Sequence, residues 1–297
     1  MTTKSPMTKF TLKQFNQIFS DDDACLNYIR SKKYPERIDC PSCAKNALFH
    51  KVTGRKTYAC DYCGYQISPT AGTIFHKSPT PLTTWFYVIY LMAQTRGGIS
   101  AKQIQRETGV TYKCAWRMCK QIRDMLSEEF DELNGKVELD ESYFGGKHAG
   151  TRGRGAQGKT AVFGMAQRGG CLEARTVKNV RRTTILPIVA ENVSKDAEVF
   201  TDEYHVYKVL PAMGYKHGTV SHVEKIYVLG DAHTNTLEGF WSQCKNGIRG
   251  VYHAVSASYL QHYLDEYSFR YNHRNDTTPM FYSFLSRAVS FVAIQAD

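Results

Sequence analysis

Long apolar runs are absent from this sequence of 297 residues. The longest extends only from Trp85 to Ala93, whereas a membrane-spanning helix needs about 20 apolar residues. The first ten residues, MTTKSPMTKF, also lack the apolar core of a secretion signal. These absences argue against helical membrane spans and predict a soluble protein of the cytoplasm.

Acidic residues are scarce in one central stretch of the chain. Residues 147–182 contain nine Lys or Arg side chains and a single acid, Glu173. The whole chain has a formal net charge of +10, which favours a polyanionic partner or an acidic membrane surface. Because 42% of the residues are hydrophobic, the chain can form real cores, and its length suits two domains or one large domain with appendages.

Four of the nine cysteines form two Cys-x-x-Cys pairs, and the other five are scattered. Sixteen residues separate the pair Cys40 and Cys43 from the pair Cys60 and Cys63, a spacing typical of a four-cysteine zinc ribbon. In a reducing compartment, metal binding explains such pairs better than disulfides do. A closed four-thiolate site is structural, so we expect Zn²⁺ to fold residues 1–80 without catalysing a reaction. The alternative, four unrelated buried thiols, does not explain the matched pairs.

A helix-turn-helix pattern follows in residues 81–134. After an aromatic helix over 83–95, the sequence predicts a short helix capped by Ser100, a break at Gly109 and a second, basic helix. In such motifs the second helix enters the major groove of DNA. The alternative is an ordinary helical hairpin with a solvated basic face. The candidate DNA-binding side chains of the second helix are Lys113, Arg117, Lys120 and Arg123.

Three acids in the remainder of the chain have the spacing of a metal-dependent polynucleotide transferase. Asp140 ends an alternating strand pattern, and Asp202 follows the apolar pair Val199-Phe200, so both are expected at or near strand ends. Glu238 follows Asp202 after thirty-five intervening residues and lies in a helical segment, with Lys245 seven residues further along the same helix face. Such carboxylates suit two Mg²⁺ ions, which can clamp the attacking and leaving oxygens of a phosphodiester displacement.

The third position has a second candidate, Asn235, whose side-chain oxygen can also bind a cation. Asn235 and Glu238 also resemble a helix capping arrangement, in which a glutamate satisfies free backbone N–H groups. A cap and a metal ligand at a helix start are compatible roles. Both residues therefore remain candidates.

Two further groups of basic residues are candidates for DNA contact. The segment 145–159 is rich in Gly and basic residues and poor in apolar ones, so it can approach a phosphate backbone closely. A merely solvated loop is the alternative. The candidates are Arg152, Arg154 and Lys159 in this segment, and Arg249 beyond the third acid.

The order of predicted elements from residue 135 to 297 is strand, strand, strand, helix, strand and then helices. This order matches a mixed sheet with the first acid on its first strand and the second acid after its fourth. An RNase H-like architecture brings these positions together. We therefore predict an α+β multidomain protein, in which a zinc ribbon and a helix-turn-helix precede an RNase H-like mixed α/β catalytic domain.

The chain resembles the zinc-ribbon insertion-sequence transposases of the DDE class, the ISXO2-like transposase family. The resemblance rests on the cysteine pairs, the helix-turn-helix and three blocks: ELDESYFGGK, VFTDEYHVY and the long block from HTNTLEGFW to FRYNHR. It covers nearly the full length. It implies an RNase H-like catalytic domain, two Mg²⁺ or Mn²⁺ ions and transposition of a small bacterial element. Some family members use Asn in place of Glu as the third catalytic residue.

The resemblance implies a DNA transposase that binds the terminal inverted repeats of its element. Cleavage would free a 3′-OH, which then attacks double-stranded target DNA, with Lys245 holding DNA near the ends. A homodimer or larger synaptic complex is expected by analogy, in the cytoplasm and associated with the nucleoid. Two other functions remain open: a non-catalytic DNA-binding regulator, and a nuclease without strand transfer.

Overall fold

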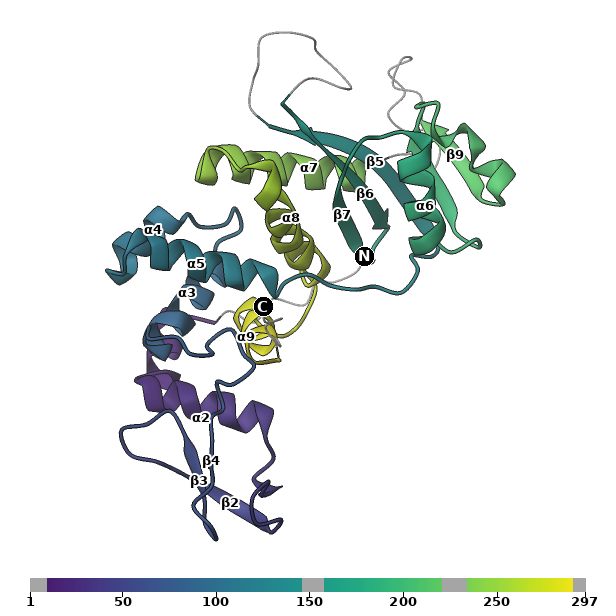
Figure 1. Ribbon diagram of the computed structural model, residues 1–297. Helices are drawn as coiled ribbons and strands as arrows, with labels where there is room; N and C mark the ends of the chain where they lie inside the picture. Colours follow the sequence, from purple (N-terminus) through teal and green to yellow (C-terminus); the bar gives the residue numbers. More distant parts are fainter. Residues whose placement is uncertain (1–9, 146–157, 221–233, 291–297) are drawn as a thin grey trace. The chain divides into compact units, whose positions relative to one another are not determined.

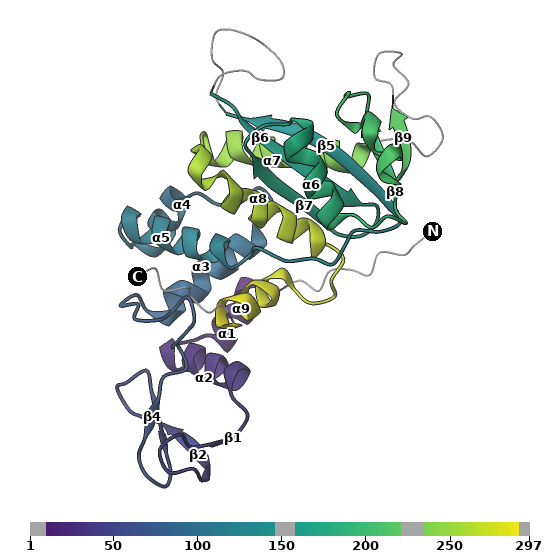
Figure 2. The ribbon, with the colours of Figure 1, turned by 45° about the vertical axis from the view of Figure 1, so that its right-hand side comes forward.

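The computed structural model describes residues 10–145, 158–220 and 234–290 of the chain (Figures 1 and 2). The chain divides into two compact units, residues 1–125 with 275–297, and residues 126–274. The elements of the first unit are α1 (Leu12–Ile18), α2 (Asp22–Lys33), β1 (Arg37–Asp39), β2 (Asn46–Lys51), β3 (Tyr58–Cys60), β4 (Gln66–Ile67), α3 (Leu82–Gln94), α4 (Ala101–Thr108), α5 (Tyr112–Asp124) and α9 (Met280–Ser290). Among the described residues, no helix is both long enough and apolar enough to cross a bilayer.

The last helix, α9, belongs to the first unit, where it packs against α2 and α3. The ring of Phe281 stacks on Phe10, with centroids 4.8 Å apart, and packs edge-on against Phe15 and Tyr90. This aromatic cluster joins the two ends of the chain in one hydrophobic core. From the sequence, all C-terminal helices were predicted in one range, 135–297, with the catalytic domain, because apolar periodicity does not show which partner a helix packs against.

The second unit is built on a mixed sheet. Its elements are β5 (Lys136–Phe144), β6 (Thr160–Gln167), β7 (Leu172–Val177), α6 (Arg182–Asn192), β8 (Glu198–Asp202), η1 (Tyr207–Val209), η2 (Pro211–Met213), β9 (Lys216–Val220), α7 (Asn235–Gly247), the π-helical turn η3 (Ile248–Tyr252) and α8 (Ala257–Asn272). The strand order is β7-β6-β5-β8-β9. The strands β5, β8 and β9 are parallel to one another, and the pairs β5–β6 and β6–β7 are antiparallel. The predicted mixed sheet and RNase H-like fold are confirmed.

The sheet is covered on both faces by helices. Strand β5 sends Val137 and Leu139 to one face, where they join a core with Val189 of α6. Helices α7 and α8 cover the opposite face (Figure 2), where Trp241 of α7 and Leu264 of α8 belong to a second core. Because side chains alternate along a strand, Glu138 and Asp140 lie on the face covered by α7 and α8.

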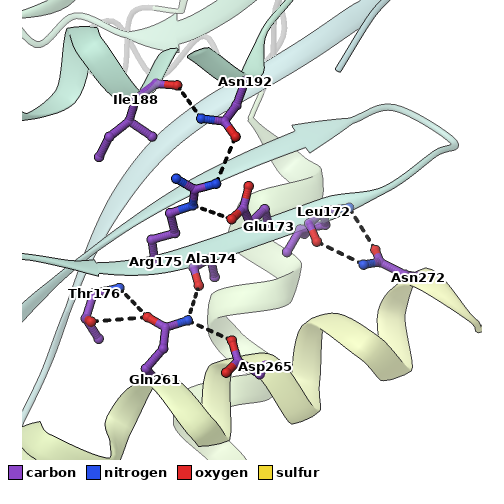
Figure 3. A network of polar contacts seen from close by, with 10 residues as sticks. All are labelled: Leu172, Glu173, Ala174, Arg175, Thr176, Ile188, Asn192, Gln261, Asp265 and Asn272. Atoms are coloured by element: carbon purple, nitrogen blue, oxygen red, sulfur yellow. Dashed lines mark hydrogen bonds and ion pairs between the residues drawn. The ribbon is translucent and has the colours of Figure 1, made fainter. Parts of the chain in front are cut away.

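Side-chain amides of α8 cover the outer edge of strand β7 (Figure 3). Gln261 accepts a hydrogen bond from the N–H of Thr176 at 2.7 Å and donates one to the carbonyl of Ala174 at 2.9 Å. Asn272 likewise accepts from the N–H of Leu172 at 2.8 Å and donates to its carbonyl at 3.1 Å. These amides take the place of a neighbouring strand, so this stretch of the edge is not open to pairing with another chain.

Candidate active site

The structure places Asp140 and Asp202 at the same level on adjacent strands. Strands β5 and β8 pair in parallel, and the last paired positions are Glu138 and Phe200. Asp140 and Asp202 each lie two residues further along, so both point to the same face as Glu138 and Phe200. Adjacent strands lie about 4.8 Å apart. The fold therefore makes neighbours of two acids that are distant in the sequence.

The surroundings of Asp140 concentrate negative charge. Burial, together with the carboxylates of Glu141 and Asp202, raises the pKa of Asp140 to about 7, and a hydrogen bond from Trp241 offsets part of this shift. The carboxylate of Glu141 also accepts a hydrogen bond from the hydroxyl of Tyr207 at 2.8 Å. Glu141 directly follows Asp140, so its side chain leaves the opposite face of β5. Asp140 and Asp202 share a face, and their carboxylate oxygens are donors that hard divalent cations prefer. The donor chemistry around Asp140 thus fits such a cation.

Helix α7 is docked onto the first acid by Trp241. The indole Nε1–H donates a hydrogen bond to Oδ2 of Asp140 at 3.0 Å. The indole ring also lies against Gly164, which faces Asp140 across the β5–β6 ladder. A Cβ atom at Gly164 would come within 2.5 Å of the ring, so only glycine leaves room for this packing. Neither Trp241 nor Gly164 was among the site residues predicted from the sequence.

We expect Gly164→Ala to displace α7 from the sheet. The new methyl group would overlap Trp241 and approach Leu237 within 2.8 Å. Overpacking of this kind costs about 1–3 kcal/mol of unfolding free energy. Gly239→Ala is the matched control, because a Cβ atom there meets nothing within 4 Å and alanine stabilises a helix by about 1 kcal/mol relative to glycine. Denaturant unfolding of both variants measures the difference, and equal stabilities would contradict this account of the packing.

Lys245 interacts electrostatically with Asp140 and with two further basic residues, Lys159 and Arg249. Burial lowers the pKa of Lys245, the Asp140 carboxylate opposes this shift, and the positive charges of Arg249 and Lys159 add to it. Lys245 is half-buried with its Nζ 5.7 Å from the centre of the Phe144 ring, whereas Arg249 and Lys159 are exposed. Basic residues predicted from two parts of the sequence thus interact at Lys245, which in turn interacts with the first acid.

Glu238 and Asn235 both lie in the first turn of α7 and both are exposed. The carboxylate of Glu238 accepts a hydrogen bond from the hydroxyl of Thr234 at 3.1 Å. The capping interpretation of Asn235 and Glu238 is wrong, because Thr234 is the N-cap residue and makes no side-chain cap bond. Glu138 of β5 caps this helix instead by accepting hydrogen bonds from N–H groups of its first turn. No pattern within the sequence of α7 points to Glu138, because Glu138 lies almost a hundred residues before this helix.

The acids are less tightly gathered than the cysteines. Over the described parts of the chain, only the four cysteines form a group of three or more Cys, His, Asp or Glu whose ligand atoms all lie within 4.8 Å of one another. Asp140, Asp202 and Glu238 make no such group. The pairing of Asp140 with Asp202 therefore follows from strand register and mutual electrostatics, and the roles of these two acids and of the third residue as metal ligands stay predictions.

The four cysteines have the geometry of a zinc site. The Sγ atoms of Cys40 and Cys63 lie 3.6 Å apart, and those of Cys43 and Cys60 lie 3.9 Å apart. Thiolates bound about 2.3 Å from a tetrahedral Zn²⁺ are separated by about 3.8 Å. The two knuckles form equivalent turns, each closed by a backbone hydrogen bond to the carbonyl of its first cysteine. The cluster supports the predicted structural zinc.

The helix-turn-helix is formed by α4 and α5. Ser100 and Thr111 cap the two helices by accepting hydrogen bonds from Gln103 and Cys114, and the left-handed conformation of Gly109 ends the first. Of the predicted DNA-binding residues, Lys113 and Arg117 are exposed, whereas Lys120 pairs with Asp124 at 2.6 Å. The prediction for Arg123 is wrong because this side chain is only 4% exposed and lies in the core. Arg123 lies one turn after the buried Cys119, on the buried side of α5.

Arg152 and Arg154, two of the predicted DNA-binding residues, lie outside the described residues. Lys159, from the same glycine-rich segment, is described and exposed.

Comparisons with known proteins agree with this architecture. Residues 20–66 match the transposase zinc-ribbon domain, and residues 132–272 match the ISXO2-like transposase domain. An uncharacterised protein in transposable element ISH50 of Halobacterium salinarum is 27% identical over 85% of this chain and 91% of its own length. An uncharacterised transposase-like protein of Haemophilus influenzae is 28% identical over 32% of this chain and 76% of its own length. The chain therefore belongs to the IS1595 family of ISXO2-like transposases, with an N-terminal zinc ribbon and a DDE transposase domain.

Proposed function

We propose that this transposase binds the terminal inverted repeats of its insertion sequence and performs metal-dependent DNA cleavage and strand transfer. The observation that supports this most directly is the register of the sheet, which makes Asp140 and Asp202 neighbours on adjacent parallel strands. The link from Trp241 of α7 to Asp140 adds to it. The site thus joins two separated acids to a helix that carries further polar groups.

The residues that would hold a divalent cation are Asp140, Asp202 and, as third ligand, Glu238 or Asn235. When bound there, a pair of Mg²⁺ or Mn²⁺ ions supplies Lewis-acid stabilisation of the attacking and leaving oxygens of a phosphodiester. The raised pKa of Asp140 supports this assignment, because crowded carboxylates are stabilised by a cation.

The protein's own groups orient the acid and hold the DNA. Trp241 orients the carboxylate of Asp140 by its hydrogen bond to Oδ2. The Asp140 carboxylate interacts electrostatically with Lys245, and Lys245 interacts with Lys159 and Arg249. In the proposed reaction these three cations would bind phosphates near the bond that breaks. Hydrolysis would leave a 3′-OH at the element end, and the same site would direct that hydroxyl against a phosphodiester of the target.

End recognition would come from the zinc ribbon and the helix-turn-helix. The exposed face of α5 carries Lys113 and Arg117, and the exposed ring of Tyr112 lies 4.8 Å from Nζ of Lys102 on α4. Basic side chains on the second helix suit a major groove and its phosphates. Because two ends must be joined together, we propose that two or more chains assemble on the DNA.

Arg117→Gln and Arg123→Gln should have opposite consequences. We expect loss of the exposed Arg117 to weaken end binding and, if it contacts a phosphate, to lower the salt dependence of log K by about one, with little change in the unfolding temperature. We expect loss of the buried Arg123 to destabilise the first unit with no direct effect on DNA contacts. Fluorescence anisotropy at several salt concentrations and thermal unfolding measure the two effects. Reversed phenotypes would contradict the orientation of α5.

The test of the proposed function uses DNA that carries the inverted repeats flanking the gene, with scrambled repeats as control. We expect cleavage at the repeat ends that requires Mg²⁺ or Mn²⁺, followed by joining of a supplied 3′-OH end to target DNA. A regulator would bind the repeats without cutting them, and a nuclease without transferase activity would cut without joining. Either result would overturn the proposal.

A further inference from the structure

Glu138 is a fully buried acid that lies two residues before Asp140 on the same face of β5. Its side chain is 0% exposed. One carboxylate oxygen, Oε2, accepts hydrogen bonds from the backbone N–H groups of Thr236 at 2.9 Å and Leu237 at 3.2 Å. The other, Oε1, accepts from the hydroxyl of Thr236 at 3.0 Å. A strand residue thus provides the side-chain cap that the first turn of α7 lacks in its own sequence.

Arg168 balances the charge of this buried carboxylate. Its Nε donates to Oε1 of Glu138 at 2.8 Å, and its guanidinium carbon lies 4.3 Å from the centre of the ring of Phe200. Phe200 is the residue paired with Glu138 across the parallel β5–β8 ladder. The backbone N–H of Arg168 also donates to the carbonyl of Lys136 at the start of β5. The ion pair is therefore attached to the two strands that carry Asp140 and Asp202.

An ion pair with a buried carboxylate contributes little net stability, since desolvation of the charges offsets most of their attraction. A helix N-terminus carries unpaired N–H groups and a partial positive charge, and both interact favourably with a carboxylate. An aspartate or serine at the N-cap position would satisfy these groups at the surface. A carboxylate from the strand instead ties the helix start to one place on β5.

Helix α7 carries the groups that the proposed reaction needs beside Asp140. Glu238 is in its first turn, Trp241 donates to Asp140 from its second turn, and Lys245 follows one turn later. We propose that Glu138 is a positioning residue, which uses the α7 N-terminus to set the height and rotation of this helix against the strands that carry the two aspartates. This inference rests on the proposed function for its catalytic consequence, whereas the capping contact itself is independent of that function.

The test compares Glu138→Gln with the parent protein at full length. A glutamine keeps the shape, but its NH₂ group cannot accept, so one of the two sets of donors now at Glu138 loses its acceptor. We expect the backbone amides in residues 234–241 to exchange hydrogen at least about tenfold faster, measured by mass spectrometry without metal or DNA. We also expect the half-saturating Mg²⁺ concentration for end cleavage to rise about tenfold or more, as for lost outer-shell partners of metal ligands, with end binding unchanged.

The matched control is Glu266→Gln in α8. Glu266 is also buried and pairs with an arginine, Arg270, at 2.7 Å in the same unit, but its partner is on its own helix and not on α7. A general loss of stability in the second unit should affect both variants equally. A change in exchange at 234–241 and in the Mg²⁺ midpoint that occurs in Glu138→Gln alone indicates positioning of α7.

A milder variant, Thr236→Val, keeps the test decisive if Glu138→Gln does not fold. It removes the hydroxyl that donates to Glu138 but keeps the ion pair between Glu138 and Arg168. We therefore expect hydrogen exchange and the Mg²⁺ midpoint to change in the same direction as in Glu138→Gln, by a smaller amount. Unchanged exchange at 234–241 in the folded variants would overturn the capping role, and an unchanged Mg²⁺ midpoint would overturn the positioning role. If the parent protein shows no metal-dependent cleavage, the proposed function fails, and the exchange measurement still decides whether Glu138 holds α7.

Discussion

Asp140→Asn should abolish both cleavage of the element ends and joining to target DNA, while the protein binds the ends as tightly as its parent. The amide removes the negative charge that a hard cation requires, at the point where burial and two neighbouring carboxylates already raise the pKa of Asp140. Loss of an outer-shell partner alone costs about 10–100-fold in metal affinity or activity. We therefore expect the loss of a ligand to cost more than about 100-fold. Single-turnover cleavage of labelled ends measures it.

Asp202→Asn should have the same effect, because Asp202 occupies the matching level of β8. Glu173→Gln is the matched control: this acid lies on the edge strand β7 of the same sheet and pairs with Arg175. We expect it to cleave at the parental rate. Normal cleavage by either aspartate variant would remove that residue from the site, and equal losses in all three variants would point to a general defect of the sheet.

Cys63→Ser should release zinc and unfold the ribbon, with loss of end binding. The ribbon sheet has only short strands, the longest of six residues, so the metal supplies most of what holds it together. Structural Zn²⁺ contributes about 10–16 kcal/mol to the folding of small zinc-finger peptides at neutral pH. We expect the zinc content to fall from one ion per chain toward zero, with end affinity lowered by at least about tenfold, as measured by atomic absorption and anisotropy.

Cys171→Ser is the matched control for zinc, because Cys171 lies in the second unit and outside the cysteine cluster. We expect it to retain one zinc ion and parental end binding. In Cys63→Ser, we expect the rate of strand transfer to fall less than the affinity for the ends, when pre-cut DNA is supplied at saturating concentration. The candidate acids belong to the other unit and do not depend on the ribbon. A Cys63→Ser protein that binds the ends normally would show that the ribbon has another role.

Local patterns in the sequence were sufficient to predict the four-cysteine cluster and the helix-turn-helix. The paired Cys-x-x-Cys spacing predicted the four-cysteine cluster, and Ser100 and Gly109 correctly marked the cap and the break of the helix-turn-helix. Each helix signal depends on residues only a few positions apart along the chain, and the cysteine cluster depends on a Cys-x-x-Cys turn that occurs twice. Arg123 was misassigned because helical periodicity over four basic residues does not tell which of them meets the core.

The sequence by itself predicted the main elements, the four-cysteine cluster and the candidate acids, because each is encoded in neighbouring residues or in a family-specific motif. Only the tertiary structure decided what lies next to Asp140. Strand register made Asp202 its neighbour, Gly164 left room for Trp241, and Glu138 took over the capping of α7 from residues of the helix itself. These contacts join positions about sixty to one hundred residues apart. Their choice depends on packing and on burial of charge, which no short stretch of sequence specifies.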